Sequence, residues 1–280
     1  MKPFFSIIIP TLNEENYISR ILTDISNQSK RNYEVIVVDG RSKDKTKQII
    51  RSFENKINLR LLEIDKPNLS RQKNIGGKEA TGEYLVFFDA DMSIRSSFIS
   101  IAERLIKKNK GLIFLPYVYP EEKKEFSEIN FVFPIINISV ELSQTINKPF
   151  SSGPSMIWEK NTFNFIGGFD DLFGEDHHII RKAHHWGIRA KCLPSLKVNF
   201  SLRRMKKQGR LDLIYHFIRS HIYLLFNDKL KERLFKYEMG GHLYEAGILK
   251  KKNKNILDQL NSKKIIKQIK KSLQSLMNEV

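Results

Sequence analysis

The chain has 280 residues, of which 41% are hydrophobic and 28% charged, and its formal net charge is +17. This hydrophobic content is enough to bury a core, which excludes an intrinsically disordered protein. The single cysteine, Cys192, excludes an internal disulfide and a cysteine-based zinc site, and it is consistent with a reducing cytoplasm. The first ten residues hold one lysine and a short apolar run, so no secretory signal is expected.

Positive charge is concentrated toward the end of the chain. Residues 1–200 hold 29 Lys and Arg against 24 Asp and Glu, whereas residues 201–280 hold 19 against 7. Such a basic segment favours a polyanionic partner, either an anionic membrane surface or a nucleic acid. We therefore expect a folded domain over 1–200 and a basic, mainly helical extension over 201–280.

Strand and helix patterns alternate in the first part of the chain. Phe4–Ile9 predicts a buried strand that Pro10 ends, and Thr11 or Asn13 would then cap a helix. The apolar residues of that helix repeat at helical spacing, and they are Ile18, Ile21, Leu22 and Ile25. Further strands are predicted at 34–38, 59–64 and 84–88, with a helix after Asp44 and a loop and short helix from Leu69. Three strand-helix units before a fourth strand imply a parallel, doubly wound α/β sheet.

The fourth predicted strand leads directly into two acids. Tyr84–Phe88 has no polar alternation, which predicts a central strand buried on both faces. Asp89 and Asp91 follow, and residues two apart in an extended segment point to the same side, so both carboxylates are expected to converge. Hard oxygen ligands at a strand end suit Mg²⁺ or Mn²⁺ on a substrate diphosphate. The alternative is that Asp-Ala-Asp is only a polar loop.

A third acid follows a different strand. Asp39 comes just after the second predicted strand, so it is expected at the same sheet edge as Asp89 and Asp91, where open α/β sheets bind ligands. A carboxylate there can accept hydrogen bonds from a base or ribose. Neither G-x-G-x-x-G nor G-x-x-x-x-G-K-[ST] occurs, so a dinucleotide fold or a P-loop is not supported.

Short motifs follow one another in a fixed order over roughly residues 4–200. They read PTLNEE (10–15), VVDGRSKD (37–44), KNIG (73–76) leading into GEY (82–84), DAD (89–91), and GGFD (167–170) followed by GED (174–176). Their order and spacing resemble those of family 2 glycosyltransferases with the GT-A fold. The resemblance implies a Rossmann-like, mostly parallel sheet flanked by helices, with a nucleotide-sugar half over 1–110 and an acceptor half over 111–200.

The resemblance also implies a role for each matched residue. Those expected to bind the nucleotide-diphosphate sugar are Pro10, Thr11, Glu14, Asp39, Arg71 or Lys73, and Asp89. Asp39 would contact the base. Asp89 and Asp91 would form the family's DxD element, with Asp91 the more direct ligand of Mn²⁺ or Mg²⁺. Asp176 matches the catalytic base, which would deprotonate the acceptor in an inverting transfer that needs no covalent enzyme intermediate.

On the acceptor side, the resemblance implicates Gly153, Gly168 and Glu175. Gly153 lies in a tight loop before a short strand predicted over 155–158, and Gly168 would let the backbone approach closely. Two plainer interpretations stay open. The glycines can form a turn, and Glu175 and Asp176 can supply acids to the first turn of a helix predicted over 177–186.

Arg203 and Arg204 open a basic, glycine-containing segment after residue 200. This segment resembles one that closes over the donor diphosphate in related enzymes, and arginine can bind phosphate oxygens bidentately. The Gln-x-x-Arg-Trp signature of processive polymer synthases is absent from the sequence. A single sugar transfer to a glycan or lipid-linked acceptor is therefore expected.

The rest of the chain contains two further helical patterns. Residues 211–226 are strongly apolar, but they fall short of the roughly 20 residues that span a bilayer, so we expect an interfacial helix or one packed on the domain. Residues 255–277 predict a basic amphipathic helix suited to an anionic membrane or a partner helix. These patterns predict a cytoplasmic protein with peripheral contact to the cytoplasmic face of a membrane.

Two other functions compete with the glycosyltransferase interpretation. A sugar-phosphate nucleotidyltransferase would show a glycine-rich, basic N-terminal signature, whereas residues 11–15 are acidic and contain no glycine. A nucleic-acid- or membrane-binding protein with a degenerate enzyme fold would explain the basic extension. However, the sequence lacks the interleaved aromatic and basic residues of a nucleic-acid-binding fold, so no nucleic acid is expected as a partner.

Overall fold

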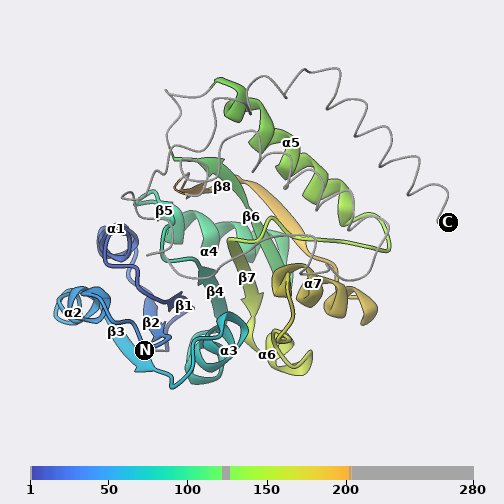
Figure 1. Cartoon of the computed structure of the whole chain (residues 1–280). Helices are drawn as coiled ribbons and strands as arrows, with labels where there is room; N and C mark the ends of the chain where they lie inside the picture. The colour runs from blue at the N-terminus through green and yellow to red at the C-terminus, as the bar shows by residue number, and fades with distance from the viewer. Residues whose placement is uncertain (1, 122–126, 202, 204–280) are drawn as a thin grey trace, which may run out of the picture. The chain divides into compact units, whose positions relative to one another are not determined.

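The computed structural model describes residues 2–121, 127–201 and 203 (Figure 1). All of them belong to the compact unit Met1–Tyr244. The predictions for Arg204, for residues 211–226 and for residues 255–277 lie outside the described residues.

The described chain alternates strands and helices. The strands are β1 (Phe5–Thr11), β2 (Tyr33–Asp39), β3 (Leu59–Glu63), β4 (Tyr84–Phe88), β5 (Ser93–Ile94), β6 (Ile113–Pro120), β7 (Ser155–Glu159) and β8 (Lys191–Phe200). The helices are α1 (Ile18–Ser26), α2 (Thr46–Arg51), α3 (Leu69–Glu79), α4 (Phe98–Asn109), α5 (Ser127–Ser143), α6 (Lys160–Phe165) and α7 (Glu175–His185). The predicted strand at 84–88 is confirmed with the same bounds.

One mixed sheet contains all of these strands, in the order β3-β2-β1-β4-β7-β6-β8-β5 (Figure 1). Strands β3, β2, β1 and β4 are parallel, as predicted. Strand β7 is antiparallel to both of its neighbours, β4 and β6, and β5 is antiparallel to β8. The carboxyl ends of β1, β2 and β4 therefore share one edge. Because β7 is antiparallel to β4, the loop that leads into β7 lies at the same edge.

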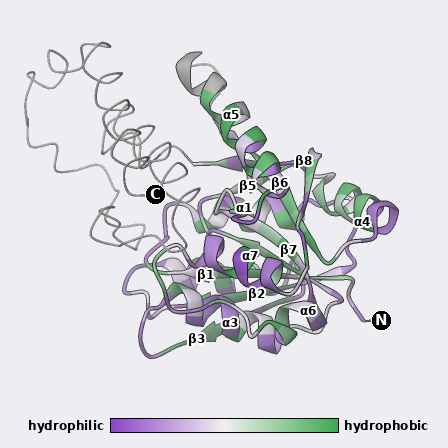
Figure 2. Ribbon diagram, turned by 90° about the vertical axis from the view of Figure 1, so that its right-hand side faces the viewer, coloured by the Kyte–Doolittle hydropathy of each residue, from purple (hydrophilic) through white to green (hydrophobic). Residues whose placement is uncertain are grey.

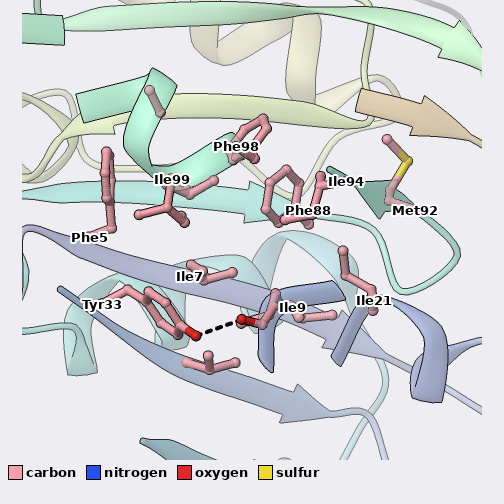
Figure 3. Close-up of a cluster of buried hydrophobic side chains, with 14 of the residues drawn as sticks. Phe5, Ile7, Ile9, Ile21, Tyr33, Phe88, Met92, Ile94, Phe98 and Ile99 are labelled. Carbon is pink, nitrogen blue, oxygen red and sulfur yellow. Dashed lines mark hydrogen bonds between the residues drawn. The ribbon is translucent and has the colours of Figure 1, made fainter. Parts of the chain in front are cut away.

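Helices cover both faces of the sheet. On one face, α1, α2 and α4 enclose a core that includes Phe5, Ile7, Phe88 and Phe98 (Figure 3). The hydroxyl of Tyr33 donates a hydrogen bond to the Ile25 carbonyl at 2.6 Å within this core. The second core, on the opposite face, packs the sheet against α5, α6 and α7. Strands buried on both faces explain the continuous apolar runs in the sequence.

Two expectations for the first strand-helix unit were wrong. Pro10 does not end β1 but lies inside it, paired in register with Val38. Strand β4 pairs with β1 only as far as Ile8. On that side of β1, Pro10 therefore has no neighbouring strand, and the N–H that proline lacks is not needed for a hydrogen bond. Thr11 and Asn13 do not cap α1, which begins at Ile18 without a side-chain cap.

The loop before α1 is instead bonded to the loop before α2. The Asn13 amide donates to Ser42 Oγ at 2.8 Å, and the Lys43 amide donates to Asn13 Oδ1 at 2.8 Å. The Glu14 amide donates to Thr46 Oγ1 at 2.7 Å. These bonds fix the polar motif after β1 at the carboxyl edge of the sheet.

Helix α5 presents an apolar outer surface. Much of the coloured ribbon of α5 is hydrophobic in Figure 2, and among its described side chains the exposed large hydrophobic ones are Ile135, Ile138 and Leu142. Within the described ranges, no helix combines the length and apolar composition that crossing a bilayer requires.

Candidate active site

Asp39 is fully buried at the carboxyl end of β2, and its carboxylate is held by three donors. Thr11 Oγ1 donates to Oδ1 at 3.1 Å, while the Ser42 amide and hydroxyl donate to Oδ2 and Oδ1 at 2.7 and 2.5 Å. Gln72 on α3 ties the neighbouring strands together, because its Nε2 donates to the carbonyls of Thr11 and Val38. These hydrogen bonds join β1, β2 and α3 at the edge where a base is expected to bind.

Asp89 and Asp91 do not lie in an extended segment. Strand β4 ends at Phe88, and the Met92 amide turns back to donate to the Asp89 carbonyl at 3.3 Å. The alternation argument for their convergence was therefore wrong, because side chains in a turn do not follow a period of two. The two acids have different cationic neighbours. Asp91 forms an ion pair with Arg203, and the charge of Asp89 acts on Lys73.

Arg203, just beyond β8, lies between two acids of the expected donor site. Its Nη1 and Nη2 donate to the two carboxylate oxygens of Glu14 at 2.5 and 2.8 Å. Its Nε is 2.8 Å from Asp91 Oδ2, and its guanidinium lies 4.5 Å from the ring centroid of Tyr17. One buried arginine thus joins the β1–α1 loop to the turn after β4.

Lys73 is buried on α3 and faces acids from both halves of the chain. Its Nζ donates to Glu175 Oε1 at 2.8 Å and lies 5.0 Å from the ring centroid of Phe169. Burial by itself would lower the pKa of Lys73, but the carboxylates of Glu175, Asp89 and Asp176 outweigh it and raise the pKa. Lys73 therefore stays protonated at neutral pH and balances this cluster of acids.

Asp176 lies in the first turn of α7, where Ser151 Oγ donates to its Oδ2 at 3.1 Å. Burial raises the pKa of Asp176, although Lys73 and the Ser151 hydroxyl lower it in part. A carboxylate with a raised pKa is a stronger base than an exposed aspartate. Beside it, burial lowers the pKa of His177 to about 4, so His177 is neutral at pH 7 and adds no positive charge.

Gly153 and Gly168 both have positive φ and both approach another residue closely. A Cβ on Gly153 would lie 3.0 Å from Asp176 Oδ2, and one on Gly168 would lie 2.5 Å from Asn74 Oδ1. Asn74 in turn exchanges two hydrogen bonds with the Phe169 backbone, each 2.8 Å long. The position of Gly153 is thus linked directly to the proposed base, whereas Gly168 serves the packing of α3 against the segment before α7.

Replacing Gly153 with alanine is expected to lower the free energy of unfolding by about 1–3 kcal/mol, because alanine is strained at φ +95° and its Cβ would contact Asp176. Gly167→Ala is the matched control, since Gly167 also has positive φ but open space around it. Urea unfolding of both variants separates the two effects. Equal losses in the two variants would show that the contact with Asp176 contributes nothing.

Arg71 and Lys73 lie on different sides of α3. Arg71 is exposed and lines a groove of about 610 Å³ together with Lys66, Asn74 and Lys78. Lys73 points into the acid cluster. The two residues that the sequence offered for binding the nucleotide sugar, Arg71 and Lys73, therefore lie in separate environments. The described residues contain no group of three or more His, Cys, Asp or Glu side chains placed to hold a metal ion.

Sequence reasoning missed Gln72 and Ser42 as parts of this site, and it expected Ser151 only as part of a loop that lines the acceptor. Ser42 follows Asp39 by three residues, and Asp often bonds to the backbone of its own turn, so that spacing was a usable signal. For Ser151, the only sign of a role in the site was its position two residues before Gly153. Nothing in the local pattern of α3 singles out Gln72, because its partners come from other strands.

Comparison with known proteins gives consistent matches. The model of glycosyl transferase family 2 matches residues 6–169. The sequence is 35% identical over 115 residues to the poly(ribitol-phosphate) beta-N-acetylglucosaminyltransferase TarS of Staphylococcus aureus, covering 40% of this chain and 20% of TarS. It is 33% identical over 171 residues to a dolichyl N-acetyl-alpha-D-glucosaminyl phosphate 3-beta-D-2,3-diacetamido-2,3-dideoxy-beta-D-glucuronosyltransferase of Methanococcus voltae, covering 57% of this chain and 49% of that protein.

Solved structures share the fold. The mannosyltransferase PcManGT of Pyrobaculum calidifontis, in complex with GDP-Man and Mn²⁺, superposes with a TM-score of 0.60 at 23% identity, covering 71% of this chain and 57% of that one. S. aureus TarS 1–349 in complex with UDP-GlcNAc gives a TM-score of 0.59 at 24% identity, covering 84% and 69%. These likenesses confirm the GT-A fold. The chain spans between a fifth and a half of the length of the two curated relatives.

Proposed function

Because the chain belongs to glycosyl transferase family 2, we propose that it moves a single sugar from a nucleotide-diphosphate sugar to an acceptor hydroxyl or lipid phosphate, with inversion at the anomeric carbon. The observation that carries this proposal is the environment of Lys73. Its Nζ donates to Glu175 Oε1 at 2.8 Å, and the carboxylates of Asp89 and Asp176 also raise its pKa. Asp89, the second proposed metal ligand, and Asp176, the proposed base, thus both act on the same buried lysine.

Asp176 is the proposed general base. As the acceptor oxygen attacks the anomeric carbon from the face opposite the leaving diphosphate, its proton would pass to Asp176, and the bond from carbon to the diphosphate oxygen would break. The raised pKa of Asp176 makes this proton transfer more favourable, and Ser151 orients the carboxylate. Glu175 and the close backbone of Gly153 and Gly168 are proposed to border the acceptor.

On the donor side, we propose that the nucleotide lies along Pro10, Thr11 and Asp39, with Asp39 accepting hydrogen bonds from the base. A divalent cation, Mn²⁺ or Mg²⁺, fits the hard oxygen donors of Asp91 and Asp89, and Asp91 already pairs with a cationic group in Arg203. When bound, such a cation would supply positive charge to the leaving diphosphate. Two acids are too few to complete its coordination shell, so diphosphate oxygens and water would supply the rest.

The acceptor class and the location in the cell are proposed from the names of relatives and from the charge of the chain. Relatives include the dolichyl-phosphate enzyme of M. voltae and a GalNAc(5)-diNAcBac-PP-undecaprenol beta-1,3-glucosyltransferase of Campylobacter jejuni, which is 28% identical over 131 residues. Their names favour a glycan or lipid-linked acceptor for this chain. Together with the basic composition of residues 201–280, they support a cytoplasmic enzyme in peripheral contact with an anionic membrane.

A thermal-shift screen of UDP, GDP, dTDP and CDP sugars, each with and without Mn²⁺ or Mg²⁺, tests this function. Ligand at a hundred times its Kd adds about 2.7 kcal/mol of stability, which corresponds to a rise in Tm of roughly 5–10 °C for a domain of this size. We expect one nucleotide sugar to give such a rise only with metal.

Asp91→Asn should abolish that rise, whereas Glu54→Gln, an exposed acid beyond α2, should retain it. A rise produced by nucleoside triphosphates but by no nucleotide sugar would favour the nucleotidyltransferase alternative. A rise that is unchanged in Asp91→Asn would contradict the metal assignment.

A further inference from the structure

The Arg203 side chain is buried between two carboxylates that the proposed donor site also needs. Arg203 is 8% exposed, Glu14 7% and Asp91 5%. The guanidinium uses its two terminal nitrogens on Glu14 and presents its third nitrogen, Nε, to Asp91. A planar cation whose charge is spread over three nitrogens suits contact with two acids at once, and the single ammonium of lysine could not reproduce it.

Burial makes this contact more than a surface ion pair. Placing two acidic side chains such as Glu14 and Asp91 inside a protein is costly unless a positive charge lies close by. Arg203 provides that charge. The contact also spans long stretches of sequence, because Arg203 is 189 residues away from Glu14.

We propose that Arg203 is the resident counter-cation of Asp91, and that a divalent metal ion must displace it from this carboxylate in order to bind. A metal ion bonded to Asp91 and a guanidinium 2.8 Å from the same carboxylate would be like charges only a few ångströms apart. Metal binding therefore releases the Nε contact. This inference rests on the proposed function only in taking Asp91 as a metal ligand.

The exchange has a consequence for the donor. Once released from Asp91, the guanidinium is still held by Glu14 through Nη1 and Nη2, so its Nε–H would be the group that meets an oxygen of the diphosphate. Arg203 would thus have two successive partners, Asp91 before the metal binds and the diphosphate afterwards. It acts as a positioning residue that sets the metal affinity of the free protein.

A different role would give the opposite sign. If Arg203 merely oriented Asp91 for the metal, as outer-shell residues commonly do, removing it would weaken metal binding. The two roles are therefore separated by the direction in which the metal affinity changes.

The experiment is a titration of the full chain with Mn²⁺, without nucleotide or acceptor, in which free Mn²⁺ is measured by electron paramagnetic resonance. We expect Arg203→Gln to bind Mn²⁺ at least about threefold more tightly than the wild type. Arg60→Gln is the matched control, because it removes the same charge from a partly exposed arginine that pairs with the buried Glu34, and it should bind as the wild type does. An unchanged or weaker affinity in Arg203→Gln would overturn the proposal.

Two additional variants keep the proposal testable if Arg203→Gln does not fold, and they check Asp91 as a metal ligand. If Arg203→Gln does not fold, Arg203→Met removes the same charge and keeps the apolar stem of the side chain, and it too should bind Mn²⁺ more tightly than the wild type; equal or weaker binding counts against the inference. Asp91→Asn should bind Mn²⁺ more weakly. If Asp91→Asn binds as the wild type does, the metal assignment in the proposed function fails, whereas the competition with Arg203 alone fails if only the Arg203 variants disagree.

Discussion

Asp176→Asn should lower kcat by about a hundredfold or more while leaving donor affinity unchanged. Asparagine keeps the shape of the side chain and a hydrogen-bond acceptor for Ser151, but it cannot accept the proton of the acceptor. The thermal stability should not fall, because the raised pKa of Asp176 shows that burying its charge is unfavourable. Steady-state kinetics with the donor found in the screen, combined with calorimetric titration of that donor, would measure both quantities.

The pH profile adds an independent check on Asp176. Because the base must be ionised, kcat/KM should rise with pH through the pKa of Asp176, at a pH above the value of about 3.9 for an ordinary aspartate. Asp171→Asn is the control, since Asp171 lies five residues earlier, is exposed and bonds to Asn68. Turnover in Asp176→Asn equal to that of the control would remove Asp176 from the role of base.

Lys73→Met is expected to have the largest effect on stability, lowering the free energy of unfolding by about 3–5 kcal/mol. The methionine fills a similar volume but leaves Glu175 and Asp176 without their buried counter-charge, and breaking a buried pair by removing one partner costs this much. Urea unfolding monitored by circular dichroism would measure the loss. Lys78→Met, on the exposed side of the same helix, should change the free energy by less than about 0.5 kcal/mol.

The loss in Lys73→Met should be greater at pH 8 than at pH 5. Lys73 lowers the pKa of Asp176, so its removal raises that pKa further above the unfolded value. Between those two values the folded state binds more protons than the unfolded state, and stability therefore falls as pH rises. The raised pKa of Lys73 means that its own contribution in the wild type is constant across this range. A loss that does not depend on pH would contradict this explanation.

The sequence was most informative where local pattern and chemistry coincide. The uninterrupted apolar run Tyr84–Phe88 predicted β4 because a strand buried on both faces needs no polar alternation. The order of the motifs identified the fold and placed Asp39 at a strand end. The roles proposed for Asp39, Asp91 and Asp176 stay predictions, because their tests require ligands.

Other features could not be predicted because they depend on contacts between distant segments. Strand β8 was not predicted. Its register with β6 shifts between Pro116 and Tyr117, so its buried residues Leu193, Leu196 and Val198 do not follow a period of two. The pairing of Arg203 with Glu14 likewise has no local signal, since it joins residues 189 positions apart.

The antiparallel strand β7 has a consequence for how the protein is made. It covers the whole length of β4, from Tyr84 to Phe88, but it is synthesised more than sixty residues later. Until Ser155–Glu159 emerges from the ribosome, β4 has an open and uncharged edge of the kind that pairs with other chains. A fragment ending near residue 110 should therefore aggregate, and residues 1–110 should become soluble only when a longer chain supplies Ser155–Glu159.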